Sequence, residues 1–286
     1  MPDCVEPSWS IRGAFGTTPL VKDPVQGPVL KNCSLIAAFA SLAWKARIGV
    51  QTGSPYTFKF YRTDQNNNVI GDSQKADGIL PADSTGKLMH ARSDDPSKYW
   101  PALYEKAYYM WLDKVGLDKS DGRPNYCNYT QGQNAITVLF QLTGYKVENI
   151  IKKTSLTDAN TVFKDIDLWC TGFARSSTNR IINTPAVAWT RDTGTQYSDT
   201  TIIKEHTYSV LGVTGKKDAT GQWTEKYIVL RNPFGSIGKD PGLSLYTPSA
   251  TWCSTYINLA DLNDGIFAIS AADFFTYFVG FAWTPG

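Results

Sequence analysis

The sequence is poor in the residues that usually build metal sites and disulfide frameworks. Its 286 residues include two histidines and five cysteines, and no two cysteines show CxxC spacing. This pattern argues against a cysteine-rich zinc module and against a dense disulfide scaffold. Reduced thiols are the simpler interpretation for the five cysteines, which are Cys4, Cys33, Cys127, Cys170 and Cys253.

Long apolar runs and clusters of one charge are also absent. The apolar stretch CSLIAAFASLAW falls short of the roughly 18 to 20 residues that a membrane-spanning helix needs. The 28 basic and 26 acidic residues give a net charge of +2 without a basic run, which argues against a nucleic-acid partner. The first residues, MPDCVEPSWSIRG, lack the basic and apolar regions of a signal peptide. We therefore expect a cytoplasmic protein without a membrane span.

The hydrophobic pattern changes once along the chain and predicts an α+β protein with two subdomains. Residues 12–182 form the predicted helical subdomain, whose buried helix 100–115 places Trp111 in the core. Residues 183–286 form the predicted β-rich subdomain, in which 215–223 connects two strands of a hairpin. Residues 78–98 are expected to be an irregular loop. The other predicted helices begin at 33, 133 and 158, and the predicted strands cover 55–62, 68–72, 184–191, 206–214, 225–233 and 265–270.

Cys33 stands between Asn32 and an apolar run with helical spacing, and this position allows two interpretations. A lone cysteine is most often a small buried hydrophobic residue without a chemical role. Alternatively, Asn32 caps the helix and puts Cys33 in its first turn, where the positive end of the helix dipole favours the nucleophilic thiolate. The local pattern alone does not decide between the two.

A cysteine nucleophile needs a base, and the candidates are His90 and His206. His90 falls in the predicted loop, whereas His206 opens the most apolar predicted strand of the second half. The imidazole also needs a group that orients it. Asn232 follows the strand that the hairpin returns from His206, so both residues are expected at the same end of the sheet. Cysteine, histidine and asparagine then occur in the order of a papain-type triad.

Several segments, in this order, resemble the protease core of the calpain family over about residues 12 to 283. They are DPVQGPVLKNCSLIAAFASLA, WPALYEKAY, EHTYSVLGV, YIVLRNPFG and DGIFAISAADFFTYF. The resemblance implies a papain-like cysteine protease fold with the active site between the two subdomains. It makes Cys33 the nucleophile, His206 the general base and then acid, and Asn232 the residue that orients the imidazole. It also makes Gln26 a donor to the oxyanion, and it places His90 in a structural pair of the family.

The sequence departs from the family pattern at several positions. One extra residue lies between Gln26 and Cys33, so Gln26 must bulge to reach the oxyanion. Phe234 replaces the tryptophan that covers the triad asparagine, and Glu205 replaces the glycine before the histidine. The resemblance also implies calcium, for which Asp23 matches one ligand position. The other expected acidic residues are missing, so we interpret Asp23 as a solvated loop carboxylate and expect no required cofactor.

Three classes of function fit this pattern. The leading hypothesis is a cysteine endopeptidase that acts as a monomer on a protein or peptide substrate through an acyl-enzyme. An acyl or peptidyl transferase would use the same triad with another acceptor. A binding module that kept the fold and lost turnover is the third hypothesis. The joint presence of Cys33, His206 and Asn232 argues against the third.

Overall fold

The computed structural model divides into two compact units, Met1–Tyr145 and Lys146–Gly286, which we call unit 1 and unit 2. This division lies before the predicted boundary at 182/183, because the strand and helix between 146 and 169 contact the β-sheet of unit 2. Cys4 and Cys253 lie outside the described residues. The structure describes residues 8–16, 18–45, 48, 50, 51, 53–117, 124, 126–129, 132–151, 158–170, 172–190, 202–237, 243, 245–247, 252 and 257–284.

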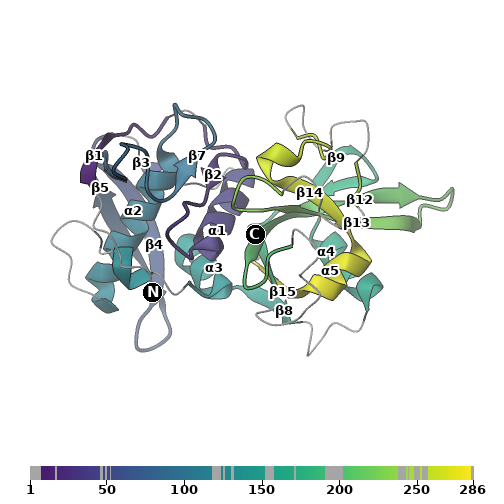
Figure 1. Cartoon of the computed structure of the whole chain (residues 1–286). Coiled ribbons are helices and arrows are strands. Elements are labelled where there is room, and N and C mark those ends of the chain that lie inside the picture. The colour runs from purple at the N-terminus through teal and green to yellow at the C-terminus, as the bar shows by residue number, and fades with distance from the viewer. Residues whose placement is uncertain are drawn as a thin grey trace. The chain divides into compact units, whose positions relative to one another are not determined.

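Unit 1 combines three α-helices with short antiparallel strands (Figure 1). Its helices are α1 (Cys33–Trp44), α2 (Trp100–Leu112) and α3 (Ala135–Thr143), with a π-helical segment Asp113–Leu117 and a 3₁₀ turn Tyr126–Tyr129. Strand β1 (Ser8–Arg12) pairs with β6 (Ile79–Ala82), and β2 (Pro24–Val25) pairs with β7 (Arg92–Ser93). A third sheet contains β3 (Val50–Gln51), β4 (Tyr56–Thr63) and β5 (Val69–Ala76).

An aromatic core holds unit 1 together. The Tyr104 ring stacks on Phe39 of α1, with 4.5 Å between centroids, and on Phe58 of β4 at 5.0 Å. Trp111 is fully buried, stacks on Phe60 at 5.2 Å, and donates its indole N–H to a carboxylate of β5. The predicted core position of Trp111 is confirmed. These large rings fix α1 and α2 against the sheet, which holds the start of α1 in place.

Unit 2 is built on one eight-stranded antiparallel sheet with two helices against it. The strand order is β14–β13–β12–β11–β15–β8, and β10 joins β9 to β12. The strands are β8 (Glu148–Ile151), β9 (Gly172–Ser176), β10 (Asn179–Ile181), β11 (Ala186–Thr190), β12 (Thr207–Lys217), β13 (Trp223–Arg231), β14 (Ile266–Ser270) and β15 (Phe278–Trp283). The helices are α4 (Ala159–Trp169) and α5 (Ala271–Tyr277), and a 3₁₀ turn covers Leu262–Asp264.

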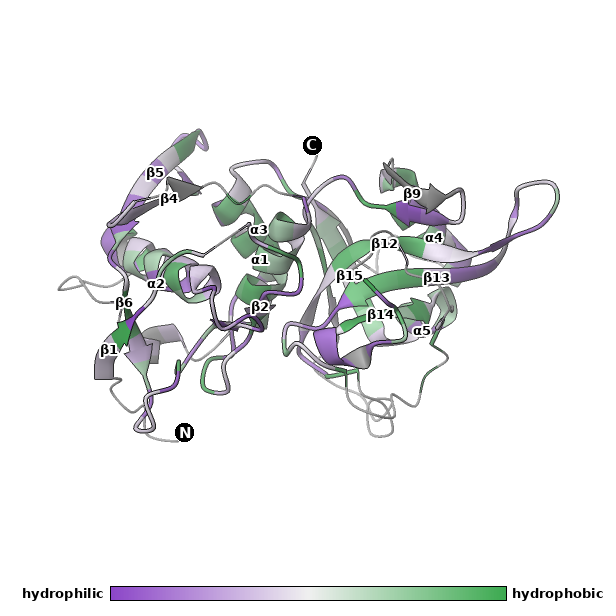
Figure 2. Ribbon diagram, turned by 90° about the horizontal axis from the view of Figure 1, so that it is seen from above, coloured by the Kyte–Doolittle hydropathy of each residue, from purple (hydrophilic) through white to green (hydrophobic). Residues whose placement is uncertain are grey.

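The hairpin of β12 and β13 organises this sheet. Ser209 pairs with Arg231 near its base, and Lys216 pairs with Glu225 near its far end. Figure 2 shows hydrophobic colouring near the base that gives way to hydrophilic colouring toward the turn. The base is fully buried, so the residues that flank it are held rigidly.

The predicted α+β class is confirmed, and most predicted elements occur within a few residues of their expected ends. Two expectations need correction. The segment 78–98 is not wholly irregular, because it holds β6 and β7. The first half holds more strands than predicted, since β1, β2, β3, β6 and β7 lie in unit 1 beside β4 and β5, which match the predicted strands 55–62 and 68–72. These strands are two to eight residues long, and the shortest have too few residues to show an alternating pattern.

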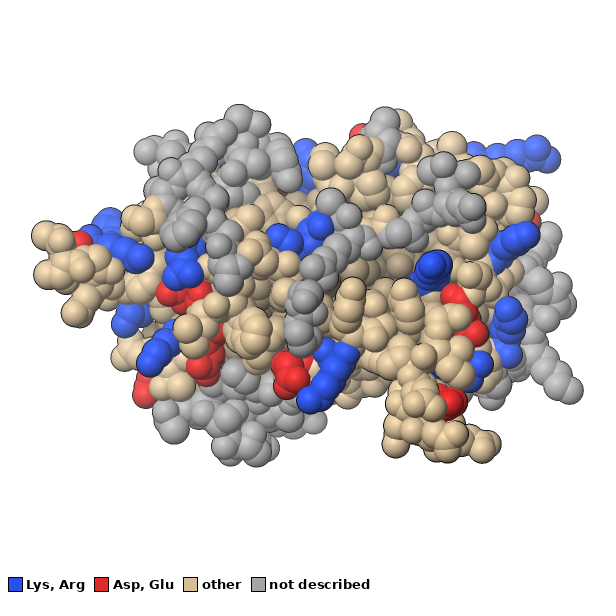
Figure 3. Space-filling view, turned by 180° about the vertical axis from the view of Figure 1, so that it is seen from behind, with Lys and Arg blue, Asp and Glu red and all other residues tan. Residues whose placement is uncertain are grey.

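Among the described residues, no helix is both long and apolar enough to cross a membrane. On the face shown in Figure 3, basic and acidic side chains are interspersed. The described part of that face carries no continuous basic patch. This distribution agrees with the near balance of charge in the sequence.

Candidate active site

Cys33 is the first residue of α1, as predicted. Its side chain is partly exposed, whereas every residue from Ser34 to Ala43 is buried. The helix is therefore buried on all sides between Ser34 and Ala43, and solvent reaches it at its two ends, at Cys33 and at Trp44. The N-terminal end of a helix carries a partial positive charge, which favours the thiolate form of Cys33.

Asn32 occupies the N-cap position but does not cap the helix with its side chain. Its backbone carbonyl accepts hydrogen bonds from the N–H groups of Leu35 and Ile36. The side-chain amide instead donates to the Glu105 carboxyl of α2 at 2.5 Å. The expected side-chain cap is therefore wrong, because Glu105 holds the amide of Asn32 away from the first turn.

Gln26 lies on the loop between β2 and α1. Its side chain is buried, and its Nε2 donates to the carbonyl of Leu30 at 2.8 Å. Arg92 of β7 donates to the backbone carbonyl of Gln26 at 3.3 Å. A side-chain amide carries two N–H donors, so the bond to Leu30 fixes Gln26 and leaves the second donor for another acceptor. The loop is also packed tightly, since a Cβ on Gly27 would lie 2.4 Å from the carbonyl oxygen of His90.

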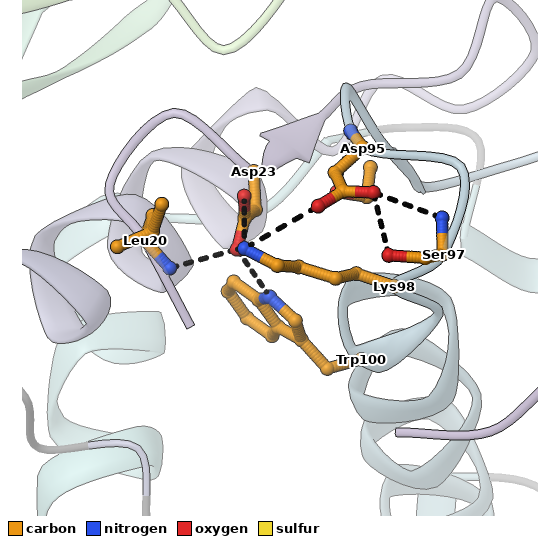
Figure 4. Close-up of polar contacts among 7 residues, drawn as sticks. Leu20, Asp23, Asp95, Ser97, Lys98 and Trp100 are labelled. Carbon is orange, nitrogen blue, oxygen red and sulfur yellow. Dashed lines mark hydrogen bonds and ion pairs between the residues drawn. The ribbon is translucent and has the colours of Figure 1, made fainter. Parts of the chain in front are cut away.

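Asp23 at the start of this loop is completely buried, so its predicted solvated position is wrong. Figure 4 shows its carboxylate surrounded by donors. Lys98 lies 3.1 Å from each carboxylate oxygen, the Trp100 indole donates at 3.0 Å, and the backbone N–H of Leu20 donates at 2.7 Å. The ammonium of Lys98 compensates the buried negative charge, which would otherwise be costly in the interior.

His206 and Asn232 come together in unit 2, at the base of the hairpin. The Nε2 atom of His206 lies 3.0 Å from Oδ1 of Asn232. Thr190 at the end of β11 fixes the backbone of His206, because its N–H donates to the His206 carbonyl and its hydroxyl accepts the His206 N–H, both at 3.0 Å. The predicted placement of these two residues at one end of the sheet agrees with this geometry.

The hydrogen bonds around Asn232 fix the protonation pattern of the imidazole. Oδ1 of Asn232 also accepts the backbone N–H of Phe234 at 3.0 Å, and Nδ2 donates to the Ser236 carbonyl at 3.0 Å. The atom that faces His206 is therefore an acceptor, which requires a proton on Nε2. In the neutral ring, the lone pair then lies on Nδ1, which can accept a proton.

Burial keeps the ring of His206 neutral. Phe234 stacks on it with centroids 4.9 Å apart and planes 15° apart. Burial lowers the pKa of His206 to about 4, and the bond to Asn232 opposes this effect. A neutral imidazole at pH 7 can act as a proton acceptor. Phe234 thus covers one face of the ring in place of the tryptophan that the resemblance implies.

His90 lies in unit 1 and has a structural environment. It is buried, and its ring lies 4.0 Å from the ring of Tyr126. Burial lowers the pKa of His90 to about 4. The buried contact with Tyr126 agrees with a structural role for His90, and the pair that the resemblance implies stays a prediction.

Known families and proteins match almost the whole chain. A profile of the family described as calpain family cysteine protease matches residues 15–282. The chain belongs to the calpain family. Calpain-12 of Mus musculus is 25% identical over 296 residues, which cover 96% of this chain and 35% of that protein. Calpain-7 of Homo sapiens is 23% identical over 293 residues, which cover 92% of this chain and 32% of that protein. The chain thus spans about a third of the length of these calpains.

The residues around Asp23 do not fit a calcium site. Calcium takes six to eight oxygen ligands. Asp23 instead places both carboxylate oxygens on the ammonium of Lys98, and one of them also accepts from Trp100 and Leu20. Among the described residues, no group of three or more histidine, cysteine, aspartate or glutamate side chains is arranged to hold a metal.

Three supporting residues were hard to predict from the sequence. Lys98, Glu105 and Thr190 are buried polar or charged residues, a class expected at the surface. One signal was present for Glu105, which lies within an almost wholly aromatic and apolar segment, WPALYEKAYYMW. The whole circumference of α2 is buried there, including Glu105 and Lys106. A charged residue in such a segment therefore indicates a buried partner.

Proposed function

We propose that this calpain-family chain is a cysteine endopeptidase with Cys33 as nucleophile, His206 as general base and acid, and Asn232 as orienting residue. The observation that carries the proposal is the imidazole of His206, whose Nε2 proton is committed to Asn232 at 3.0 Å. This bond leaves Nδ1 as the atom that exchanges protons with the thiol. The partly exposed thiol at the start of α1 supplies the nucleophile.

In the acylation step, Nδ1 of His206 takes the proton of the Cys33 thiol, and the thiolate attacks the peptide carbonyl carbon. The tetrahedral oxyanion accepts hydrogen bonds from the backbone N–H of Cys33 and from the second Nε2 proton of Gln26. Each such donor contributes about 2.7 to 4 kcal/mol in other enzymes. The C–N bond then breaks, the imidazolium gives its proton to the leaving amine, and a thioester remains on Cys33.

In the deacylation step, His206 accepts a proton from water, whose oxygen attacks the thioester carbonyl. The C–S bond breaks, a carboxylic acid product leaves, and the imidazolium returns its proton to the sulfur. An amine that replaces this water would give transfer instead of hydrolysis. Both reactions require the Cys33 sulfur and Nδ1 of His206 to meet within about 3 to 4 Å, which is the papain-like arrangement of the two units that we propose.

A turnover assay on a peptide library tests the roles of the triad. We expect Cys33→Ala and His206→Ala each to lower kcat by at least about 10³-fold, as removal of triad residues does elsewhere. Cys170→Ala is the matched control, because Cys170 is a thiol buried in unit 2 next to α4. That variant should keep its activity. Turnover that survives in Cys33→Ala or His206→Ala would refute the triad.

Two further measurements separate the functional classes. Hydroxylamine in the assay diverts an acyl-enzyme to a hydroxamate, so hydroxamate formation indicates the thioester intermediate. The ratio of hydroxamate to carboxylic acid product shows whether hydroxylamine or water is the better acceptor. The rate of alkylation of Cys33 by iodoacetamide reports its thiolate. A chain without turnover whose Cys33 reacts no faster than a simple thiol would be a binding module.

A further inference from the structure

Glu105 of α2 has an unusual position for an acidic residue. Its side chain is almost completely buried, and no ion pair involves it within the part of the chain that the structure describes. A buried carboxyl without a cation lowers stability unless its oxygens are hydrogen-bonded. Both oxygens of Glu105 are hydrogen-bonded, since Oε1 accepts from the Asn32 amide at 2.5 Å and Oε2 from the Ala91 N–H at 3.0 Å. Glu105 therefore ties two separate segments to α2.

The first segment is the start of α1. Asn32 directly precedes Cys33 and is among the best capping residues, so its oxygen would normally bond to N–H groups of the first turn. Here the side chain of Asn32 is turned to Glu105 and makes no capping bond. The positive end of the α1 dipole is then not offset by a capping oxygen beside the Cys33 thiol.

The second segment is the stretch around Ala91, which contacts the loop that carries Gln26. Ala91 lies between His90, whose carbonyl packs against Gly27, and Arg92, which donates to the carbonyl of Gln26. The bond from the Ala91 N–H to Glu105 fixes this loop. One carboxyl group thus binds both Asn32, which precedes Cys33, and the segment that contacts the Gln26 loop.

The surroundings favour the uncharged form of this carboxyl. Burial raises the pKa of Glu105 to about 8, and its hydrogen bonds with Ala91 and Asn32 oppose the shift. The phenols of Tyr109 and Tyr126 are also buried, and burial raises the pKa of each well above its ordinary value. A neutral Glu105 supplies hydrogen-bond acceptors near the thiol without a negative charge that would oppose the thiolate.

We propose that Glu105 is a positioning residue for the nucleophile: it holds the side chain of Asn32 off the end of α1 and so keeps the helix terminus directed at Cys33. This inference rests on the proposed cysteine peptidase function. It adds a residue that touches neither substrate nor thiol and acts through Asn32.

The experiment compares Glu105→Gln with Glu225→Gln. Glutamine at 105 keeps the shape but offers one acceptor oxygen instead of two, so the Asn32 amide and the Ala91 N–H can no longer both donate to residue 105. Glu225 is a matched control because it lies on the hairpin of unit 2 and pairs with Lys216.

We measure the pH dependence of iodoacetamide alkylation at Cys33, kcat, KM and the thermal midpoint. For Glu105→Gln we expect the apparent pKa of the Cys33 thiol to rise by about one unit, which lowers its alkylation rate about tenfold below that pKa. We expect a similar fall in kcat with little change in KM, and no change in Glu225→Gln.

A second variant keeps the test decisive if Glu105→Gln fails to fold. Asn32→Ser places a good capping residue that is too short to reach Glu105. We expect its thiol pKa to rise in the same way, while its thermal midpoint changes little. An unchanged alkylation profile in whichever of the two variants folds, with or without a lower thermal midpoint, would overturn the proposal and leave Glu105 a structural residue. Because alkylation needs no substrate, a wild-type chain without turnover would refute the peptidase function separately.

Discussion

Glu205, immediately before His206, has a backbone φ of +51°. This left-handed conformation costs an ordinary L-residue about 1 to 2 kcal/mol, and glycine adopts it freely. The sequence shows glutamate where the family resemblance implies glycine, and the structure holds this glutamate in the left-handed conformation. The turn that presents the imidazole therefore stores strain.

We predict that Glu205→Gly raises the free energy of unfolding by up to about 1 kcal/mol, because the relieved strain exceeds the added entropy of the unfolded chain. Urea denaturation of the variant in a Cys33→Ala background measures this without self-cleavage. Glu225→Gly, within strand β13, is the control and should lower stability. An equal loss of stability in both variants would contradict the strain at Glu205.

The residues of the candidate site differ in how far the sequence could predict them. Cys33, His206 and Asn232 could be proposed because each stands at the end of an element with a strong hydrophobic pattern. Asp23 could not be interpreted correctly, because its partner Lys98 lies 75 residues further along the chain. A buried ion pair between distant residues leaves no periodic signal, and each partner alone resembles a surface charge.

The loop that leads into α1 is held by the buried contact between Asp23 and Lys98. The carboxylate of Asp23 joins the loop to the residues just before α2, and the pairing of β2 with β7 lies directly beside it. Short elements such as β2 and β7 depend on these side-chain contacts, which explains why sequence patterns predicted the helices better than the loop. The ion pair thus positions the element that carries Gln26.

We predict that Lys98→Met destabilises the protein by about 3 to 5 kcal/mol, because it leaves the Asp23 charge buried without a cation. Urea denaturation measures the change. Lys216→Met is the control, since its ion pair with Glu225 is exposed and should contribute little to stability. The double variant Asp23→Asn, Lys98→Met should recover part of the loss. A loss in Lys98→Met no larger than in Lys216→Met would show that the pair does not hold the loop.

The same ion pair predicts how the protein responds to calcium. With Lys98 on both oxygens of Asp23, we propose that wild-type activity and thermal midpoint do not respond to calcium or to a chelator. A saturable rise of the midpoint with calcium would contradict this.

At the scale of the whole molecule, three buried groups set the pH dependence of stability. Burial lowers the pKa values of His90 and His206 to about 4 from 6.5, so the unfolded chain binds more protons between these values and stability falls as the pH drops from 6.5 to 4. Burial raises the pKa of Glu105 to about 8 from 4.5. The folded chain therefore binds the extra proton, and this contribution is lost as the pH rises from 4.5 to 8.

We predict that the free energy of unfolding is greatest at about pH 6 to 7, since two histidines outweigh one carboxyl below this range and Glu105 alone acts above it. Urea midpoints of the Cys33→Ala protein between pH 5 and 9 measure the profile. In Glu105→Gln the decline above pH 7 should disappear. Stability that keeps rising to pH 9 in the parent protein would contradict the buried neutral carboxyl.

The division into two units was the least predictable feature of the whole chain. The hydrophobic pattern changes near residue 183, yet β8 and α4 belong with the sheet of unit 2. A helix such as α4 has the same amphipathic pattern whichever sheet it packs against, so its sequence does not show which unit it belongs to. The sequence therefore predicts whether a segment is a helix or a strand more reliably than it predicts what that segment packs against.

The hairpin of β12 and β13 offers a practical use for engineering. His206 and Asn232 flank its base, whereas its turn at 218–222 is polar and stabilised by local bonds to the Asp218 carboxylate. A peptide tag or fluorophore inserted in this turn would leave the strand register at the base unchanged. Removing a single residue from β13 would instead turn Asn232 to the opposite face of the sheet and uncouple it from the imidazole.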